Sequence, residues 1–210
     1  MHNYFNFTSF CLFTGLILTG AGDVFCAGGD LQTISTFVNT PQKGWEMSCL
    51  MHETLSKLSN LPLISVALVN GRAVGGGAEL TLVPDLRAFA KTNGKLSFVQ
   101  AKMGVIPGWG GGTRLKNLVG PSKALEILLS CRTLSSNEHQ GLCDQIVSDD
   151  KCLEETQIWL EKLVQHDRSV LQSLKQTLNS EASFELERNQ FAPLWGGPAN
   201  KMALSKNLKH

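Results

Sequence analysis

The 210-residue sequence lacks any long run of like charges and several signature motifs of common enzyme classes. Its 19 basic and 18 acidic residues give a formal net charge of +1, so electrostatics does not favour nucleic acid as a partner. It contains neither a Walker A loop nor a GxSxG segment, and so gives no support to a nucleotide-binding P-loop or a serine hydrolase of that type. With 42% hydrophobic residues, the chain is expected to form one globular domain.

Three familiar motifs built from cysteine, histidine or glycine are also absent or incomplete in this sequence. The six cysteines include no CxxC pair, so we expect reduced thiols in a cytosolic protein. His52-Glu53 resembles the start of an HExxH motif, but Ser56 stands where the second histidine is required. A dinucleotide fingerprint that starts at Gly20 has Phe25 in place of its third glycine. We therefore expect neither a metal nor a cofactor.

The apolar stretch at residues 10–21 admits two interpretations. It is apolar enough for the core of a signal peptide, yet no Lys or Arg precedes it and it is too short to span a membrane. The alternative is a buried strand at Leu16–Thr19 that leads into a glycine-rich bend. We favour the strand and expect no membrane association.

Alternating strand-like and helix-like segments predict an α/β fold with a mainly parallel sheet. The segment after Asp30 is expected to be a loop, and apolar residues from Met47 to Leu58 then follow helical spacing. Residues 104–112 are expected to be a loop because they are rich in Gly and Pro. Strands are predicted at 16–19, 63–69, 86–90, 96–99 and 145–147, and further helices at 75–82, 113–119, 122–129, 136–141 and from 153 onward.

Two glycine-rich segments, at residues 25–30 and 75–79, stand where predicted strands end. Each could be a tight turn without a chemical role. Glycine, however, lets a backbone approach a ligand closely and adopt positive φ, so two such bends could aim two N–H groups at one oxygen. Glu79 strengthens that interpretation, because a glutamate among Ala78, Leu80 and Leu82 is expected to be buried and suited to proton transfer.

Together with residues 103–115 (MGVIPGWGGGTRL), these segments resemble the enoyl-CoA hydratase/isomerase (crotonase) superfamily, in an ordered match from about Gly15 to Val147. The resemblance implies a spiral of ββα units, a homotrimer and a site for an acyl-CoA thioester. In that site the N–H groups of Gly29 and Gly76 would hold the thioester carbonyl oxygen. Further substrate contacts are implied for Ala27, Asp30, Gly75, Trp109 and Gly110.

One position departs from the hydratase pattern. Hydratases of this superfamily carry a second glutamate, which corresponds to Gln100 here, and glutamine cannot act as the base that adds water. A neutral amide suits a substrate with its own carboxylate, since two charges about 4 Å apart repel by roughly 4 kcal/mol at an effective dielectric near 20. A malonyl-type CoA ester forms its enolate by losing CO2 without a base, with Glu79 as the candidate proton donor.

Trp109 and the segment LWGGPAN at residues 194–200 narrow the resemblance. They are similar to a branch of the superfamily that decarboxylates ethylmalonyl-CoA, and methylmalonyl-CoA less well, in the cytosol. This activity would belong to metabolite repair in fatty-acid metabolism. An enoyl-CoA isomerase or hydratase remains an alternative, as does a catalytically inactive chain that joins a trimer as a binding partner.

The resemblance also divides the chain. Residues 1–14 do not resemble the family, residues 15–148 would form the α/β core, and residues 149–210 a C-terminal helical region. In the family, strands and a helix precede the segment that matches residues 16–19. We therefore expect an N-terminally incomplete domain whose exposed sheet edges favour aggregation.

Overall fold

The computed structural model describes residues 14–136, 141–181 and 183–206. Within these ranges the strands form two four-stranded sheets. The first sheet is parallel throughout and has the order β1-β3-β5-β8. Its strands are β1 (Gly15–Thr19), β3 (Ile64–Val69), β5 (Leu86–Ala90) and β8 (Gln145–Val147). The predicted α/β class is confirmed, and so are the strands predicted at these four places.

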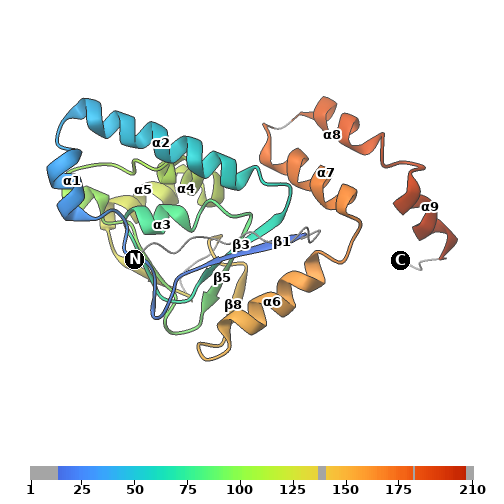
Figure 1. Cartoon of the computed structure of the whole chain (residues 1–210), viewed down its shortest axis with the longest axis horizontal. Coiled ribbons are helices and arrows are strands. Elements are labelled where there is room, and N and C mark those ends of the chain that lie inside the picture. The colour runs from blue at the N-terminus through green and yellow to red at the C-terminus, as the bar shows by residue number, and fades with distance from the viewer. Residues whose placement is uncertain (1–13, 137–140, 182, 207–210) are drawn as a thin grey trace.

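The second sheet has the order β2-β4-β6-β7, with β7 antiparallel to β6 and the other pairs parallel. Its strands are β2 (Val24–Cys26), β4 (Arg72–Val74), β6 (Lys95–Ser97) and β7 (Thr133–Ser135). The first six strands alternate between the sheets, because β1, β3 and β5 of the first sheet (Figure 1) are each followed in the chain by a strand of the second, β2, β4 and β6. The carboxyl ends of three parallel strands therefore meet at one edge of the second sheet.

Turns that pass the chain from one sheet to the other are packed tightly. A Cβ on Gly71 would lie 2.0 Å from the carbonyl oxygen of Asp23, so only glycine fits there. Asn70 joins two of these turns: its Nδ2 donates to the carbonyl oxygens of Gly20 and Gly22, and its Oδ1 accepts from the N–H of Gly20. This network fixes the point at which β2 begins relative to β4.

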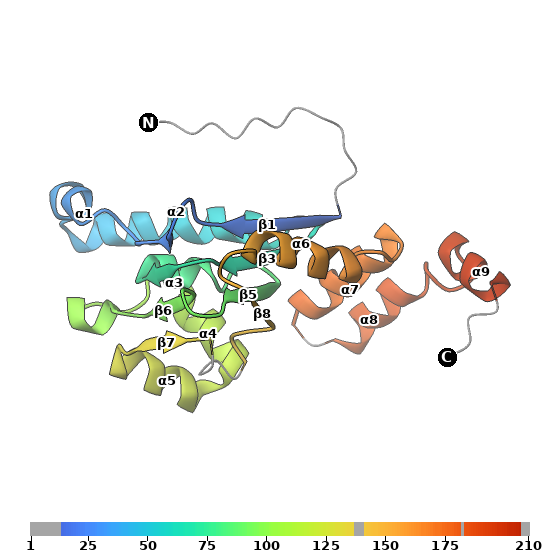
Figure 2. The same ribbon diagram turned by 90° about the horizontal axis from the view of Figure 1, so that it is seen from below.

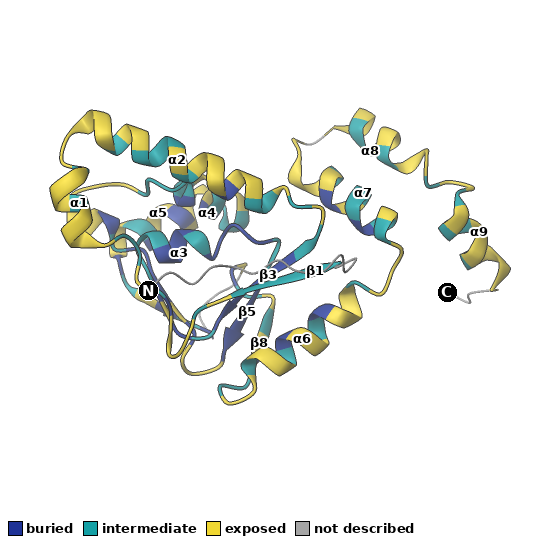
Figure 3. Ribbon diagram, viewed as in Figure 1, coloured by how far each residue is buried: buried dark blue, intermediate teal, exposed yellow. Residues whose placement is uncertain are grey.

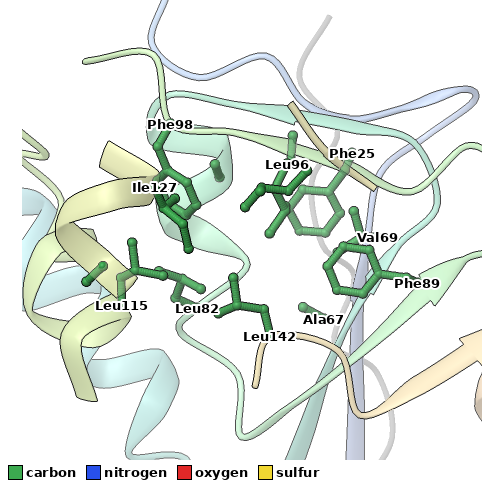
Figure 4. Close-up of a cluster of buried hydrophobic side chains, with 14 residues drawn as sticks. Phe25, Ala67, Val69, Leu82, Phe89, Leu96, Phe98, Leu115, Ile127 and Leu142 are labelled. Carbon is green, nitrogen blue, oxygen red and sulfur yellow. The ribbon is translucent and has the colours of Figure 1, made fainter. Parts of the chain in front are cut away.

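The strand β3 is buried on both faces, as its continuous apolar run predicted. Ala67 and Val69 belong to the larger core cluster, which also contains Phe25, Phe89 and Leu96 (Figure 4). Val66 and Leu68 instead join a second cluster that includes Leu160 of α6 (Cys152–Leu163). The first sheet therefore lies between two apolar layers.

Most helices form where the sequence predicts them. Thr40 caps α2 (Pro41–Ser59) by accepting from the N–H of Lys43, and Pro41 occupies its first turn. The other helices before the C-terminal region are α1 (Leu31–Phe37), α3 (Gly76–Leu80), α4 (Gly111–Val119) and α5 (Pro121–Ser130).

Several local predictions were wrong or incomplete. The segment after Asp30 forms the helix α1 rather than a loop, because the Asp30 carboxylate accepts hydrogen bonds from the N–H groups of Gln32 and Thr33. Gly111 and Gly112 belong to α4 rather than to the preceding loop. The short strands β2, β4 and β7 were not predicted. The helix predicted at 136–141 falls largely on residues 137–140, which lie outside the described residues.

The C-terminal region is helical, as predicted, and only its first part packs against the sheets. In α7 (Arg168–Asn179), Lys175 is 8% exposed and donates to the carbonyl oxygen of Leu63 (2.7 Å) and to Oδ2 of Asp85 (2.8 Å). Beyond it, α8 (Phe184–Phe191) and α9 (Pro198–Ser205) extend away from the body and are largely exposed (Figures 1 to 3). No helix in the described part of the chain is long and apolar enough to cross a membrane.

Candidate active site

Three segments singled out in the sequence follow the three parallel strands of the second sheet. Residues 27–30 follow β2, residues 75–79 follow β4, and Gln100 stands three residues after β6. Because β2, β4 and β6 are neighbours and parallel, their carboxyl ends bring these segments to one place. The topology therefore assembles a candidate site from parts that are far apart in sequence.

The two glycine bends are in direct contact. Gly28 has a φ of +91°, and a Cβ built on it would lie 2.7 Å from the carbonyl oxygen of Val74 and 3.3 Å from the nitrogen of Gly76. A Cβ on Gly77 would lie 2.1 Å from the carbonyl oxygen of Cys26. Side chains at these positions would force the bends apart, so glycine is required for their approach.

Gly75 connects the second bend to the third strand. Its φ is +55°, and its N–H donates to the carbonyl oxygen of Ser97, the last residue of β6, at 2.8 Å. The start of α3 is thereby held against the end of β6.

The N–H groups of Gly29 and Gly76 find no hydrogen-bond acceptor among the described residues. Gly76 is the first residue of α3, where backbone N–H groups have no partner within the helix. Trp109 packs over it, since a Cβ on Gly76 would lie 2.6 Å from Cζ3 of the indole. Ile34 of α1 packs on Gly29 in the same way, with Cδ1 at 2.5 Å from the corresponding Cβ position. Two unpaired donors therefore lie beside apolar side chains.

Glu79 is buried as predicted, with only 2% of its surface exposed. Its Oε1 accepts from Nε2 of Gln100 at 2.9 Å. Its Oε2 accepts from the backbone N–H groups of Trp109 and Gly111, each at 2.8 Å. All three of these partners donate to the Glu79 side chain. The side chain thereby fastens the loop that carries Trp109 to α3.

Gln100 begins the short 3-10 helix η1 (Gln100–Met103) and is 8% exposed. Its amide nitrogen is used by Glu79, whereas its buried Oε1 has no hydrogen-bond partner among the described residues. The structure thus brings together Gly29, Gly76, Glu79 and Gln100, the four residues predicted to be catalytic.

The Trp109 loop is held from two further sides that the sequence did not indicate. A guanidinium nitrogen of Arg114 donates to the carbonyl oxygen of Trp109 at 2.9 Å, and Ser48 of α2 donates to the carbonyl oxygen of Gly108 at 2.7 Å. Partial burial lowers the pKa of Arg114, and the nearby charge of Glu79 opposes that shift. Arg114 lies inside the segment that resembles the family, but only the folded loop shows which carbonyl group it contacts.

The remaining predicted substrate-binding residues have unequal surroundings. Gly110 has a φ of +86° and precedes α4, while Ala27 is exposed at the first bend. The Asp30 carboxylate caps α1 and accepts from Thr33, whose side-chain hydrogen bond lowers the pKa of Asp30. Asp30 therefore orders the helix that carries Ile34 to the site.

Residues 11–193 match the family model described as enoyl-CoA hydratase/isomerase. The chain belongs to this family. The match contains all three strand-end segments of the candidate site. The predicted membership in the enoyl-CoA hydratase/isomerase superfamily is thus confirmed.

Several curated relatives of this chain are named ethylmalonyl-CoA decarboxylase. The mouse (Mus musculus) protein is 41% identical over 207 residues, a match that covers 93% of this chain and 64% of that protein. The rat (Rattus norvegicus) protein is also 41% identical, with 93% and 69% covered. The chicken (Gallus gallus) protein is 38% identical, with 93% and 68% covered. The chain thus spans about two thirds of the length of these relatives, and slightly less for the mouse protein.

Solved structures from the same family confirm the fold. An enoyl-CoA hydratase from Bacillus anthracis superposes with a TM-score of 0.83 at 25% identity, covering 91% of this chain and 78% of that one. An enoyl-CoA hydratase from Polaromonas sp. JS666 gives the same TM-score and identity, with 94% and 81% covered. The predicted crotonase-like α/β fold is therefore confirmed.

Proposed function

We propose that this chain decarboxylates a malonyl-type acyl-CoA thioester, with ethylmalonyl-CoA as the preferred substrate and methylmalonyl-CoA as a poorer one. The observation that carries the proposal is the pair of unpaired N–H groups, on Gly29 and Gly76, at two bends in contact. The choice of substrate rests on the relatives named ethylmalonyl-CoA decarboxylase.

The two N–H groups would act on the thioester carbonyl oxygen as an oxyanion hole. The bond between the α-carbon and the free carboxylate breaks, CO2 leaves, and the electron pair spreads onto that oxygen as an enolate. Fixed donors stabilise this developing charge, and removal of one such donor costs about 3–4 kcal/mol. No basic side chain is needed for this step, in keeping with glutamine at position 100.

Glu79 and Gln100 would then have separate tasks. With every observed partner of Glu79 donating to it, its carboxylate is suited to hold the Trp109 loop and the Gln100 amide in place. Glu79 as a proton donor stays a prediction, and positioning is the role that its partners favour. The neutral Gln100 amide avoids the repulsion that a second carboxylate would exert on the carboxylate of the substrate.

We further propose a cytosolic homotrimer that acts in metabolite repair during fatty-acid metabolism. Exposed apolar side chains in the C-terminal region support an assembly. Phe184 is 83% exposed, Trp195 is 70% exposed, and exposed apolar groups of this kind mark contact surfaces.

The decisive experiment measures CO2 release from ethylmalonyl-CoA for the wild type and two variants at one position. Gly76→Ala and Gly76→Pro both push the Trp109 indole aside, because a Cβ at residue 76 would meet it at 2.6 Å. Only proline also removes the N–H group. We expect Gly76→Pro to be slower than Gly76→Ala by a factor on the order of 10² to 10³.

The same preparations are assayed for hydration of crotonyl-CoA and for isomerisation of an enoyl-CoA. Hydration or isomerisation by the wild type without CO2 release would replace the proposal by one of those activities. Equal rates for the two Gly76 variants would show that this N–H group stabilises no charge.

A further inference from the structure

The amide oxygen of Gln100 is a buried acceptor without a partner in the described part of the chain. The residue is 8% exposed, and its other amide atom already donates to Glu79. Buried polar groups are almost always hydrogen-bonded, because leaving one without a partner is energetically costly. We therefore expect that another group donates a hydrogen bond to this oxygen when substrate is bound.

The orientation of this amide follows from its neighbours. Glu79 accepts from the N–H groups of Trp109 and Gly111 through one carboxylate oxygen, so the other oxygen faces Gln100. A carboxylate can only accept hydrogen bonds, so the NH2 group of Gln100 must face it. Glu79 thereby turns the Gln100 carbonyl oxygen away from itself.

This oxygen lies close to the proposed oxyanion hole. Glu79 follows Gly76 by three residues in α3, and helix residues at that spacing share one face. Trp109 joins the two positions, since its backbone N–H donates to Glu79 while its indole covers Gly76. Gln100 is therefore held beside the first turn of α3, where the thioester oxygen would bind.

The chemistry of the substrate limits which group can donate a hydrogen bond to the Gln100 amide oxygen. The acyl part of a malonyl-type thioester presents carboxylate and carbonyl oxygens, and neither can donate to Gln100. Water can donate, and ordered water molecules commonly satisfy buried polar groups that have no partner in the protein.

We propose that Oε1 of Gln100 positions a water molecule that delivers the final proton to the α-carbon of the enolate, an inference that rests on the proposed decarboxylation. Gln100 is thus a positioning residue that acts through water. After CO2 has left, one O–H bond of the water breaks and a C–H bond forms at the α-carbon. The resulting hydroxide takes a proton from solvent, so each turnover consumes one proton.

The test follows deuterium into the product when the reaction runs in D2O. Water held on one side of the planar enolate delivers deuterium to one face, so wild type should give butyryl-CoA labelled at C2 in a single configuration. Gln100→Met keeps the length of the side chain and removes the acceptor. We expect it to release CO2 still, but to lose face selectivity at least about tenfold, as judged from the ratio of the two configurations.

Two further variants complete the design. Glu79→Gln places an NH2 group opposite Gln100, which then turns its oxygen toward residue 79 and away from the site, so selectivity should fall here too. Gln157→Met makes the same chemical change as Gln100→Met on the exposed surface of α6, where Gln157 contacts Glu161, and should label like wild type.

The outcomes separate the two proposals. If wild type releases no CO2 from ethylmalonyl-CoA, the proposed function is overturned and the water position falls with it. If wild type releases CO2 and Gln100→Met still labels a single face, the water position alone is overturned. Loss of selectivity in both Gln100→Met and Glu79→Gln, with unchanged labelling by Gln157→Met, supports it.

Discussion

At the scale of single residues, the Glu79 carboxylate connects segments that lie far from its own short helix in the sequence. It accepts from Gln100 on η1 and from two backbone N–H groups of the loop that leads into α4. Its methylene group also limits residue 111 to glycine, because a Cβ there would lie 2.4 Å from Cγ of Glu79. One side chain thus fixes three segments around the candidate site.

Replacing Glu79 by Ala should therefore destabilise the fold strongly. Three donors lose their acceptor, and each buried donor left unsatisfied costs about 1–3 kcal/mol, so we expect a loss of at least about 3 kcal/mol in the free energy of unfolding. Glu79→Gln should lose less than about 1.5 kcal/mol, because its oxygen still serves the two backbone N–H groups while Gln100 turns over to meet the new amide. Urea unfolding of both variants measures the difference, and equal losses would contradict it.

The sequence indicated Glu79 and Gln100 through their neighbours in the chain, but it could not show that they contact each other. Apolar residues around Glu79 predicted its burial, which the structure confirms at 2% exposure. The hydrogen bond between Glu79 and Gln100 joins residues 21 positions apart, and it depends on the pairing of β4 with β6. Ile34 was missed for a similar reason, since its contact with Gly29 exists only once α1 has formed.

At the scale of elements, the longer segments were predicted from their periodic patterns. The helix α2 and the strand β3 carry clear helical and buried-strand patterns over 19 and 6 residues. The strands β4 and β7 have three residues each, too few to show alternation. Gly111 and Gly112 joined α4 against their low helix propensity, because Glu79 accepts from the N–H of Gly111.

The turn between β5 and β6 is held by Asp149, and this gives a prediction for acid pH. The carboxylate accepts from the N–H groups of Thr92 and Asn93, and the hydrogen bond from Asn93 lowers the pKa of Asp149 below its ordinary value of 3.8. A lowered folded-state pKa stabilises the fold above the unfolded-state value, and this contribution is lost as the pH falls through the folded-state pKa.

Asp149→Asn should therefore be less stable than wild type at pH 7, and the difference should shrink as the pH falls below about 4. Urea unfolding at a series of pH values measures this change. Asp150→Asn provides the matched control, because the carboxylate of Asp150 accepts no hydrogen bond from the residues that the structure describes. A difference between wild type and Asp149→Asn that is independent of pH would contradict the assignment.

At the scale of the whole molecule, the chain divides into a packed body and an extended helical arm. The arm consists of residues 183–206, which include α8 and α9. The body contains both sheets and the candidate site, and α7 is fastened to it by the Lys175–Asp85 ion pair. In the arm, Phe191 and Trp195 contact each other with ring centroids 5.5 Å apart, yet both remain more than half exposed. The sequence predicted helices in this region, but it could not show that their apolar side chains lie outside the core.

If the arm forms the contacts of a homotrimer, polar substitutions in it should dissociate the assembly without unfolding the body. We expect Phe184→Ser combined with Trp195→Ser to shift the chain from trimer to monomer in sedimentation velocity. Phe37→Ser is the control, since Phe37 is exposed to 65% on α1, away from the arm. A wild type that sediments as a monomer would contradict the proposed assembly.

The contact between Trp109 and Gly76 has a practical consequence, because it places a fluorophore on the proposed oxyanion hole. A thioester that binds the N–H of Gly76 must change the surroundings of that indole, and so the wavelength or intensity of its emission. We expect a saturable emission change when a non-hydrolysable acyl-CoA analogue is added. Trp109→Phe should abolish this change although Trp45, Trp159 and Trp195 remain. The fluorescence of Trp109 would then measure thioester binding separately from the chemical reaction.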